Sequence, residues 1–254
     1  MFDLTGKTAL ITGASRGIGE AAARIMAKYG ASVVLAARSK TDIERIAKEI
    51  RNGGGKAAAV ACDVASFDDV TAAVNLAKSE FGGLDILVNN AGLIDPISRL
   101  DVSDPEGWGT VIDVNVKGVY YGLRAAVPEM LKAGQGTIIN ISSGAATGAL
   151  EGWSHYCASK AAVLSLTKCA DKEFGGLGIR VMGLSPGTVA TDMQVAIKAS
   201  GINPVSQLDP SVHIPADWVG ETIAWLSTEA GNDYCGTDCS LRDEGVRKAV
   251  GLIS

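Results

Sequence analysis

The sequence predicts an α/β protein with a parallel sheet in a single domain. Short runs rich in β-branched residues alternate with longer helical segments along the chain. This alternation is typical of parallel strands joined by right-handed helical crossovers. The 254 residues, 47% of them hydrophobic, also suffice for one large core. We therefore expect one domain over residues 1–254.

The first half of the chain holds four strand and three helix signals. Each strand is a short apolar run, each helix is a longer amphipathic segment, and glycine clusters at 53–55 and 82–83 end two of the helices. In chain order, we expect a strand at 8–12, a helix at 17–29, a strand at 32–37, a helix at 41–52, a strand at 57–61, a helix at 67–81 and a strand at 84–88.

The second half continues the same alternation. Pro128 lies near the end of its first helix, and three prolines between 192 and 215 keep the later connection irregular. We expect a helix at 114–131, a strand at 137–142, a helix at 156–174, a strand at 179–184, an irregular segment, a helix at 218–227 and a last strand near 236–241.

Composition narrows the class of ligand. The net charge is −5 and no stretch is strongly basic, which argues against nucleic acid and anionic membrane surfaces as partners. No leader or membrane-spanning run is recognisable, so we expect a cytoplasmic protein. Five scattered cysteines fit reduced thiols. With only two histidines we expect no metal.

A glycine-rich turn joins the first strand to the first helix. Residues 12–19 read Thr-Gly-Ala-Ser-Arg-Gly-Ile-Gly. Glycines let the backbone approach a pyrophosphate, and the helix N-terminus offers unpaired amides to the anion. The spacing differs from the commoner G-x-G-x-x-G, but its position between strand and helix predicts dinucleotide binding.

The end of the second strand indicates which dinucleotide binds. An acid about twenty residues after the turn would bind the ribose 2′-hydroxyl of NAD, but this chain has no acid there before Asp42. Arg38 suits a 2′-phosphate, because a guanidinium pairs bidentately with phosphate oxygens. Arg16 can approach the same group. We expect NADP(H) to be preferred, with NAD(H) possible.

Tyr156 and Lys160 stand four residues apart at the head of an apolar helical run. This spacing places the phenol and the ammonium on one helix face. A nearby cation stabilises the phenolate and lowers the pKa of the phenol from its usual value of about 10. The pair is therefore interpreted as a tuned proton donor or acceptor. Ser143 lies thirteen residues before Tyr156.

Taken together, these residues make the chain resemble the short-chain dehydrogenase/reductase family over almost its whole length. Within that family the chain is most similar to the ordinary-length branch of 3-oxoacyl-carrier reductase-like carbonyl reductases. The motifs that occur in family order are the glycine turn, Asp63-Val64, Asn89-Asn90-Ala91-Gly92, Asn115 in Val-Asn-Val, Ile141-Ser142-Ser143, Tyr156-x-x-x-Lys160 and the run from Pro186 to Thr191.

The resemblance implies a doubly wound (Rossmann) sheet of seven parallel strands with helices on both faces, and hydride transfer between a nicotinamide cofactor and a carbonyl/alcohol pair. It implies that Ser143 polarises the substrate oxygen, Tyr156 protonates it, Lys160 binds the nicotinamide ribose and keeps the pKa of Tyr156 low, and Asn115 holds a water for proton return. The cofactor-binding residues that it implies are Gly13, Ser15, Arg16, Gly17, Ile18, Gly19, Arg38, Ser39, Asp63, Val64, Asn89, Ala91, Gly92, Tyr156, Lys160, Pro186, Gly187, Thr188, Val189 and Thr191.

The segment at about 192–215, which folds over the substrate in this family, is expected to form a lid. It is poor in charge and fairly apolar, which favours a neutral, fairly apolar ketone. Leu177 stands where carrier-protein reductases tend to place an arginine, so a carrier-bound substrate ranks below a free ketone. The tail after Tyr234 departs from the family's V-D-G-G, and its contribution to a pocket stays open.

Two other functions stay open. One is an NAD(P)-dependent alcohol dehydrogenase, since the same residues catalyse the reverse reaction. The other is a nonenzymatic dinucleotide-sensing protein, against which the four catalytic groups argue. The resemblance also implies a homotetramer in which the helices at 114–131 and 156–174 pack across a two-fold axis.

Overall fold

Seven parallel strands form one continuous sheet. The structure, a computed structural model that describes residues 2–254, places them in the order β3-β2-β1-β4-β5-β6-β7. This confirms the doubly wound Rossmann sheet. The strands are β1 Thr8–Thr12, β2 Ser32–Ala37, β3 Lys56–Ala61, β4 Ile86–Asn89, β5 Gly136–Ile141, β6 Ile179–Ser185 and β7 Asp238–Ser240.

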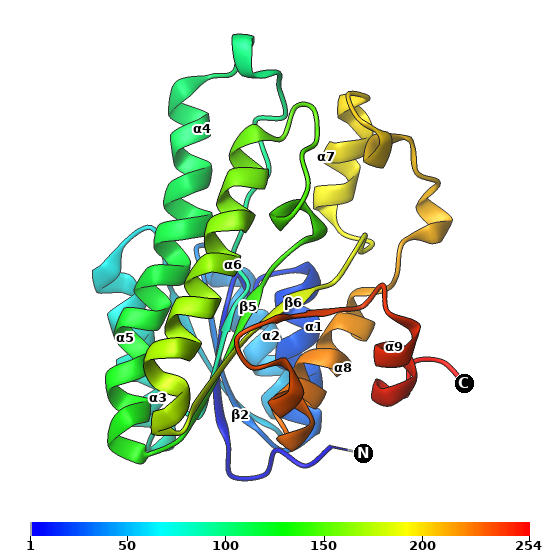
Figure 1. The fold of residues 1–254 in the computed structure, drawn as a ribbon. Helices are drawn as coiled ribbons and strands as arrows, with labels where there is room; N and C mark the ends of the chain where they lie inside the picture. Colours follow the sequence, from blue (N-terminus) through cyan, green and yellow to red (C-terminus); the bar gives the residue numbers. More distant parts are fainter. Residues whose placement is uncertain (1) are drawn as a thin grey trace.

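Helices cover both faces of the sheet (Figure 1). One hydrophobic cluster joins the sheet to α1, α2, α8 and α9, and a second joins it to α3, α5 and α6. The helices are α1 Gly17–Lys28, α2 Lys40–Asn52, α3 Phe67–Phe81, α4 Pro105–Ile112, α5 Gly118–Ala133, α6 Ser154–Phe174, α7 Asp192–Ser200, α8 Ala216–Leu226 and α9 Glu244–Val250.

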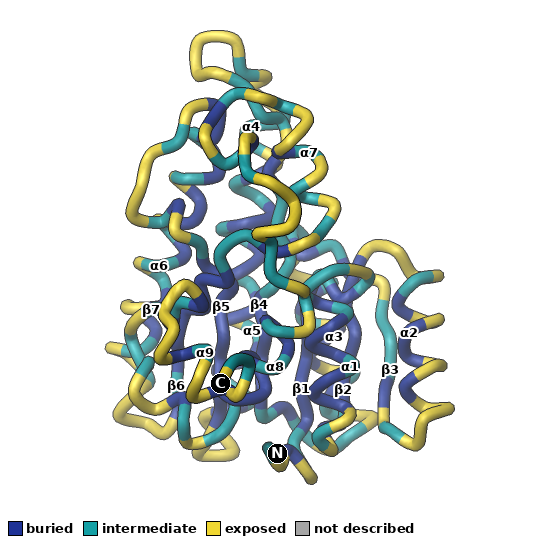
Figure 2. The backbone as a smooth tube through the Cα atoms, turned by 90° about the vertical axis from the view of Figure 1, so that its right-hand side faces the viewer, coloured by how far each residue is buried: buried dark blue, intermediate teal, exposed yellow. Residues whose placement is uncertain are grey.

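The middle of the sheet is the most buried part of the molecule. Every residue of β1, β4 and β5 is buried, and Figure 2 shows these strands in dark blue between exposed helix surfaces and loops. Strands covered on both faces need apolar side chains on both faces, which explains runs such as Ile86-Leu87-Val88. The buried strands provide a rigid base for the loops at their carboxyl ends.

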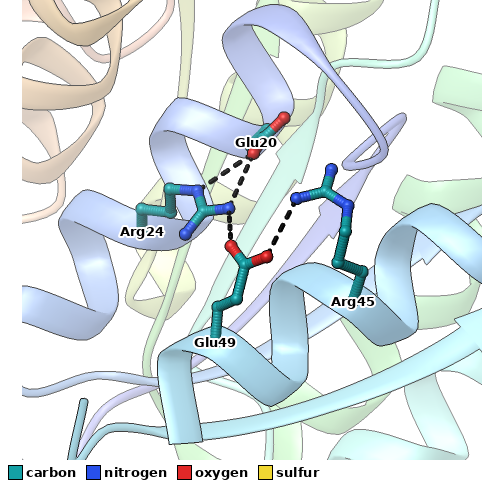
Figure 3. A network of polar contacts seen from close by, with 4 residues as sticks. All are labelled: Glu20, Arg24, Arg45 and Glu49. Atoms are coloured by element: carbon teal, nitrogen blue, oxygen red, sulfur yellow. Dashed lines mark hydrogen bonds and ion pairs between the residues drawn. The ribbon is translucent and has the colours of Figure 1, made fainter. Parts of the chain in front are cut away.

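A charged cluster ties α1 to α2 on the surface (Figure 3). Arg24 on α1 donates to Glu20 one turn earlier at 2.8 Å and to Glu49 on α2 at 2.5 Å. Arg45 donates to the same Glu49 at 3.1 Å. Because all four side chains are partly or fully exposed, solvent screens these pairs, and we assign the cluster a minor part in stability.

The structure differs from the sequence expectation in three helices. A helix, α4, occupies 105–112, where none was expected; Asp104 caps it by accepting a hydrogen bond of 2.8 Å from the Gly107 N–H. The segment expected to be irregular begins with α7. The tail adds α9, which Asp243 caps by accepting from the Gly245 N–H at 2.7 Å.

The expected helix at 114–131 is also different in detail. A turn of π-helix at Asp113–Lys117 connects α4 to α5, so the three form one long column beside α6 (Figure 1). Pro128 lies inside α5, near its end as expected. The wider turn re-aims one side chain, that of Asn115, toward α6. Among the described residues, no helix combines the length and the hydrophobicity that crossing a bilayer requires.

Candidate active site

A cleft of about 1060 Å³ runs along the carboxyl ends of the strands. Loops that follow β1 to β6 all contribute to its walls. It spans the position where the strand order reverses, between β1 and β4, and open α/β sheets bind ligands at this place. The cleft is large enough for a dinucleotide together with a second small molecule.

The glycine turn forms one end of this cleft. Gly13 has φ +65°, and a Cβ built on it would lie 2.8 Å from the Ala91 Cα, so a side chain does not fit there. Gly17, at φ +56°, opens α1 with its first turn directed at the cleft. No side chain caps α1, so its terminal amides are available to an anion. This arrangement fits a pyrophosphate.

Arg38 and Ser39 continue the cleft from the end of β2. The guanidinium of Arg38 has no ion-pair or hydrogen-bond partner within residues 2–254, whereas Arg16 pairs with Asp192 on α7 at 3.0 Å. The Ser39 hydroxyl donates to Asp42 at 2.5 Å. A free arginine stands where a 2′-phosphate is expected, with one acid beside it.

Ser143 and Tyr156 meet in the middle of the cleft. Burial raises the pKa of Tyr156 to about 12, while the hydrogen-bonding side chain of Ser143 lowers it. The ring of Trp153 packs edge-on against the phenol, with centroids 5.5 Å apart. Tyr156 is therefore a protonated acid at neutral pH. The expectation of a lowered pKa is wrong for the chain by itself, because desolvation outweighs any effect of the neighbouring ammonium.

Lys160 lies one turn after Tyr156, with its Nζ 5.6 Å from the centre of the phenol ring. The Nζ donates a hydrogen bond of 2.7 Å to the backbone carbonyl of Ile141 at the end of β5. Lys160 is only 5% exposed. Burial lowers the pKa of its ammonium to about 8, and the nearby carboxylate of Asp238 opposes this shift. The cation is thus held below the phenol, at the wall of the cleft.

Asn115 has a different environment from the one expected. Its Oδ1 accepts from the Leu93 N–H at 2.8 Å, and its Nδ2 donates to the Leu93 carbonyl at 2.9 Å and to the Ser159 hydroxyl at 3.0 Å. These bonds occupy the amide with protein partners. The structure therefore shows Asn115 fixing the loop after β4 to α6, behind the cleft wall.

Most of the residues expected to bind the cofactor line the cleft, as do three of the four expected catalytic residues. The lining residues are Gly13, Ser15, Arg16, Gly17, Ile18, Arg38, Ser39, Asp63, Val64, Ala91, Gly92, Ser143, Tyr156, Lys160, Pro186, Gly187, Thr188, Val189 and Thr191.

Gly19, Asn89 and Asn115 lie outside the lining. For Asn89 this corrects the expectation that it lines the cleft. Its Nδ2 donates to Asn140 on β5 at 2.9 Å, and its side chain packs beneath Gly122 of α5, where there is no room for a Cβ. For Gly19, a Cβ would meet the Gly13 carbonyl at 2.4 Å, so this glycine allows the close packing of the turn.

The opposite end of the cleft is bounded by the segment after β6. Met193, Ile197 and Val205 face Ile94 and Leu150 there. The base of this segment is closed by parallel pairing of Val189 with Ile214, and Asn203 donates to the Glu151 carbonyl at 3.0 Å. These contacts hold an apolar wall over Tyr156.

Arg242 is the most notable of the lining residues that the sequence analysis did not single out. Arg242 stands two residues after the end of β7 and reaches the cleft beside Gly144 and Gly187. The sequence held one indication of this role: in the tail, Arg242 stands close to the position of the aspartate in the family's V-D-G-G. Only the parallel pairing of β7 with β6 brings this tail to the cleft.

Comparisons with known proteins agree with this geometry. The family model described as short chain dehydrogenase matches residues 7–200. The chain is 42% identical over 249 residues to oxidoreductase UcpA of Salmonella typhimurium, covering 93% of each protein. It is 38% identical over 236 residues to 3-oxoacyl-[acyl-carrier-protein] reductase of Synechocystis sp., covering 92% of this chain and 94% of the relative.

A solved structure agrees as well. The crystal structure of a short-chain type dehydrogenase/reductase from Mycobacterium marinum matches with a TM-score of 0.87 at 34% identity. The match covers 96% of this chain and 97% of the other. The fold thus has a counterpart along nearly the whole chain.

Proposed function

The chain belongs to the short-chain dehydrogenase/reductase family, and from this premise we propose that it uses NADP(H) to reduce a ketone with a neutral, fairly apolar body. As a family member it is an NAD(P)-dependent oxidoreductase. One observation carries the proposal. Ser143, Tyr156 and Lys160 share a single cleft with a phosphate turn and the unpaired guanidinium of Arg38.

The residues present fit a dinucleotide. The cradle at Gly13 and Gly17 accepts no side chain and would hold the pyrophosphate at the start of α1. Arg38, with Ser39, would bind the 2′-phosphate, and the stretch from Thr188 to Thr191 would hold the carboxamide. When bound, a reduced nicotinamide supplies the hydride.

Ser143 and Tyr156 perform the acid step. Both side chains line the same cleft and are close enough to hydrogen-bond to each other, so both would donate to one carbonyl oxygen. As negative charge develops on that oxygen, Ser143 stabilises it and Tyr156 transfers its proton. A phenol with a pKa near 12 holds its proton until the oxygen becomes strongly basic, so proton transfer follows charge development.

Lys160 supports this step in two ways. Its ammonium would bind the ribose hydroxyls, and its charge would stabilise the phenolate that remains on Tyr156. Asn115 acts as a positioning residue, because its amide ties Leu93 to Ser159, the residue before Lys160. Proton return through a water held by Asn115 would require one of these bonds to open.

A matched set of variants tests the proposal. Consumption of NADPH and NADH is followed with a panel of aliphatic and cyclic ketones for the native chain, Tyr156→Phe and the control Tyr29→Phe, whose hydroxyl donates to Glu221 outside the cleft. We expect faster turnover with NADPH, a loss of about 10²- to 10⁴-fold in Tyr156→Phe and no change in the control. Turnover that survives in Tyr156→Phe would reject the mechanism, and binding of NADPH without turnover of any ketone would favour the nonenzymatic alternative.

Two related activities use the same residues. The reverse reaction, oxidation of an alcohol, is a second candidate, and assaying both directions with the same pair separates them. The similarity to a 3-oxoacyl-[acyl-carrier-protein] reductase favours a carrier-bound substrate as a third. Leu177, which is 57% exposed at the end of α6, offers no charge to an acidic carrier, so we place the free ketone first.

We also propose that the chain assembles as a homotetramer in the cytoplasm. On α5, Tyr120 is 48% and Leu131 is 38% exposed, and burying such side chains against another copy is favourable. All five cysteines are free thiols, which suits a reducing compartment. Light scattering that gives the mass of a monomer would reject the assembly.

A further inference from the structure

The tail places a cation at the substrate end of the cleft. Arg242 follows β7 and lines the cleft beside two backbone segments of the site. A Cβ built on Gly144 would lie 3.9 Å from the Arg242 Nη1, and one built on Gly187 would lie 3.7 Å from its Cγ. Gly144 directly follows Ser143. The guanidinium is therefore close to the residue that follows Ser143, and both side chains line the same cleft.

This guanidinium is unpaired within residues 2–254. The hydrogen bond that Arg242 donates comes from its backbone N–H, to the Ser240 hydroxyl at 3.3 Å. The two acids that follow it in the sequence are engaged elsewhere: Asp243 caps α9, and Glu244 pairs with Lys248 at 3.2 Å. Of the acids that line the cleft, Asp192 pairs with Arg16, and Asp95 makes no ion pair with Arg242. The substrate end thus carries a free cation.

We propose that Arg242 binds a carboxylate of the substrate, so that the ketone is an oxo acid with an apolar chain. The inference rests on the proposed function. It keeps the neutral, apolar body of the ketone that the lid favours and adds one carboxylate at its end. A planar guanidinium pairs bidentately with a carboxylate, and such bonds are roughly twice as strong as neutral ones. Because Gly144 adjoins Ser143, the carboxylate should lie a few bonds from the carbonyl.

The test uses substrate pairs that differ only in charge. Straight-chain oxo acids with the carbonyl at position 2, 3, 4 or 5 are compared with their methyl esters, using NADPH and the native chain, Arg242→Gln, Arg242→Lys and Lys248→Gln. Lys248→Gln removes the same charge from the exposed face of α9. At one chain length at least, we expect kcat/KM to favour the acid about tenfold or more. Arg242→Gln should abolish this preference and leave the ester within about threefold, while Lys248→Gln retains it.

Two outcomes overturn the inference: a native enzyme that prefers the ester at every chain length, or Arg242→Gln lowering acid and ester equally. Ester turnover without an acid preference rejects the role of Arg242 and leaves the proposed function standing. A second measurement does not depend on turnover. Benzoate should perturb the fluorescence of enzyme-bound NADPH at lower concentration than benzamide does, and Arg242→Gln should remove this difference; equal responses in the native chain reject the inference.

Discussion

The Nζ of Lys160 lies 5.6 Å from the centre of the Tyr156 ring, and both side chains are buried on the same face of α6. Burial acts on them in opposite directions: it raises the pKa of the phenol to about 12 and lowers that of the ammonium to about 8. In both cases the neutral form gains. The pair therefore does not hold a permanent phenolate. Negative charge would develop on Tyr156 only when substrate and cofactor are bound.

The first prediction concerns the stability cost of Lys160. Its folded pKa is lowered from 10.5 to about 8, so the unfolded chain binds more protons between these values and stability rises with pH there. Lys160→Met removes the buried charge. We expect the variant to be inactive yet more stable than the native chain by up to about 3 kcal/mol below pH 8, with the advantage vanishing by pH 10.5. Urea unfolding across this range measures it, and a native chain that is more stable than the variant at pH 7 would contradict it.

The pH dependence of reduction should follow the same group. Below pH 8 the Lys160 ammonium is charged and stabilises the developing phenolate, and above it the charge is lost. We expect kcat/KM for ketone reduction to be level below about pH 8 and to fall above it. Ser143→Ala should lower the whole curve without moving its break. A profile that rises through pH 8 would show that the neutral amine is the active form.

Asn115 should matter for stability as well as activity. Its replacement by Ala leaves the Leu93 N–H and carbonyl and the Ser159 hydroxyl without their partner. Because unsatisfied buried groups are costly, we expect a loss of about 2–4 kcal/mol in the free energy of unfolding. Asn52→Ala, at the exposed end of α2, serves as control. A loss below about 1 kcal/mol would mean that these bonds contribute little, so that one of them could open for a water, as the water-holding role requires.

Arg38 should decide between the two dinucleotides. Arg38→Gln removes the charge that we propose binds the 2′-phosphate, and we expect the Kd for NADPH to rise about tenfold or more while that for NADH changes little. Arg45→Gln, on α2 and outside the cofactor cleft, controls for lost surface charge. Fluorescence titration gives both constants. An equal rise in the two Kd values would mean that Arg38 does not distinguish the cofactors. The choice between them would then depend on Asp42 and its contact with the ribose.

The sheet and most of the cleft followed from the sequence because their signals are local. A buried parallel strand needs an apolar run, and a phosphate turn needs glycines where a Cβ collides, as at Gly13. The end of β4 shows where such reasoning stops. Asn89 and Asn90 are equally polar, yet Asn90 lines the cleft while Asn89 turns under α5. The alternation of side chains along β4 directs Asn89 and Asn90 to opposite sides of the sheet. The sequence alone does not show which of the two points toward the cleft.

Other features depended on long-range packing. The helices that Asp104 and Asp243 cap are only eight and seven residues long, too short for a periodic apolar pattern to predict them. The pKa of Tyr156 depends on how deeply its ring is buried against Trp153, which the spacing of Tyr and Lys does not reveal. Arg242 reaches the cleft only because β7 pairs with β6 at the edge of the sheet.

The proposed reacting groups and much of the wall around them come from separate stretches of chain. Ser143 follows β5, and Tyr156 and Lys160 stand on α6, whereas one wall of the cleft comes from 192–205 and from Arg242. Directed evolution can exploit this separation. Libraries confined to these two stretches should yield enzymes with altered substrate selectivity and an unchanged chemical step. No member of such a library changes Tyr156, the proposed proton donor, or Lys160, which supports it.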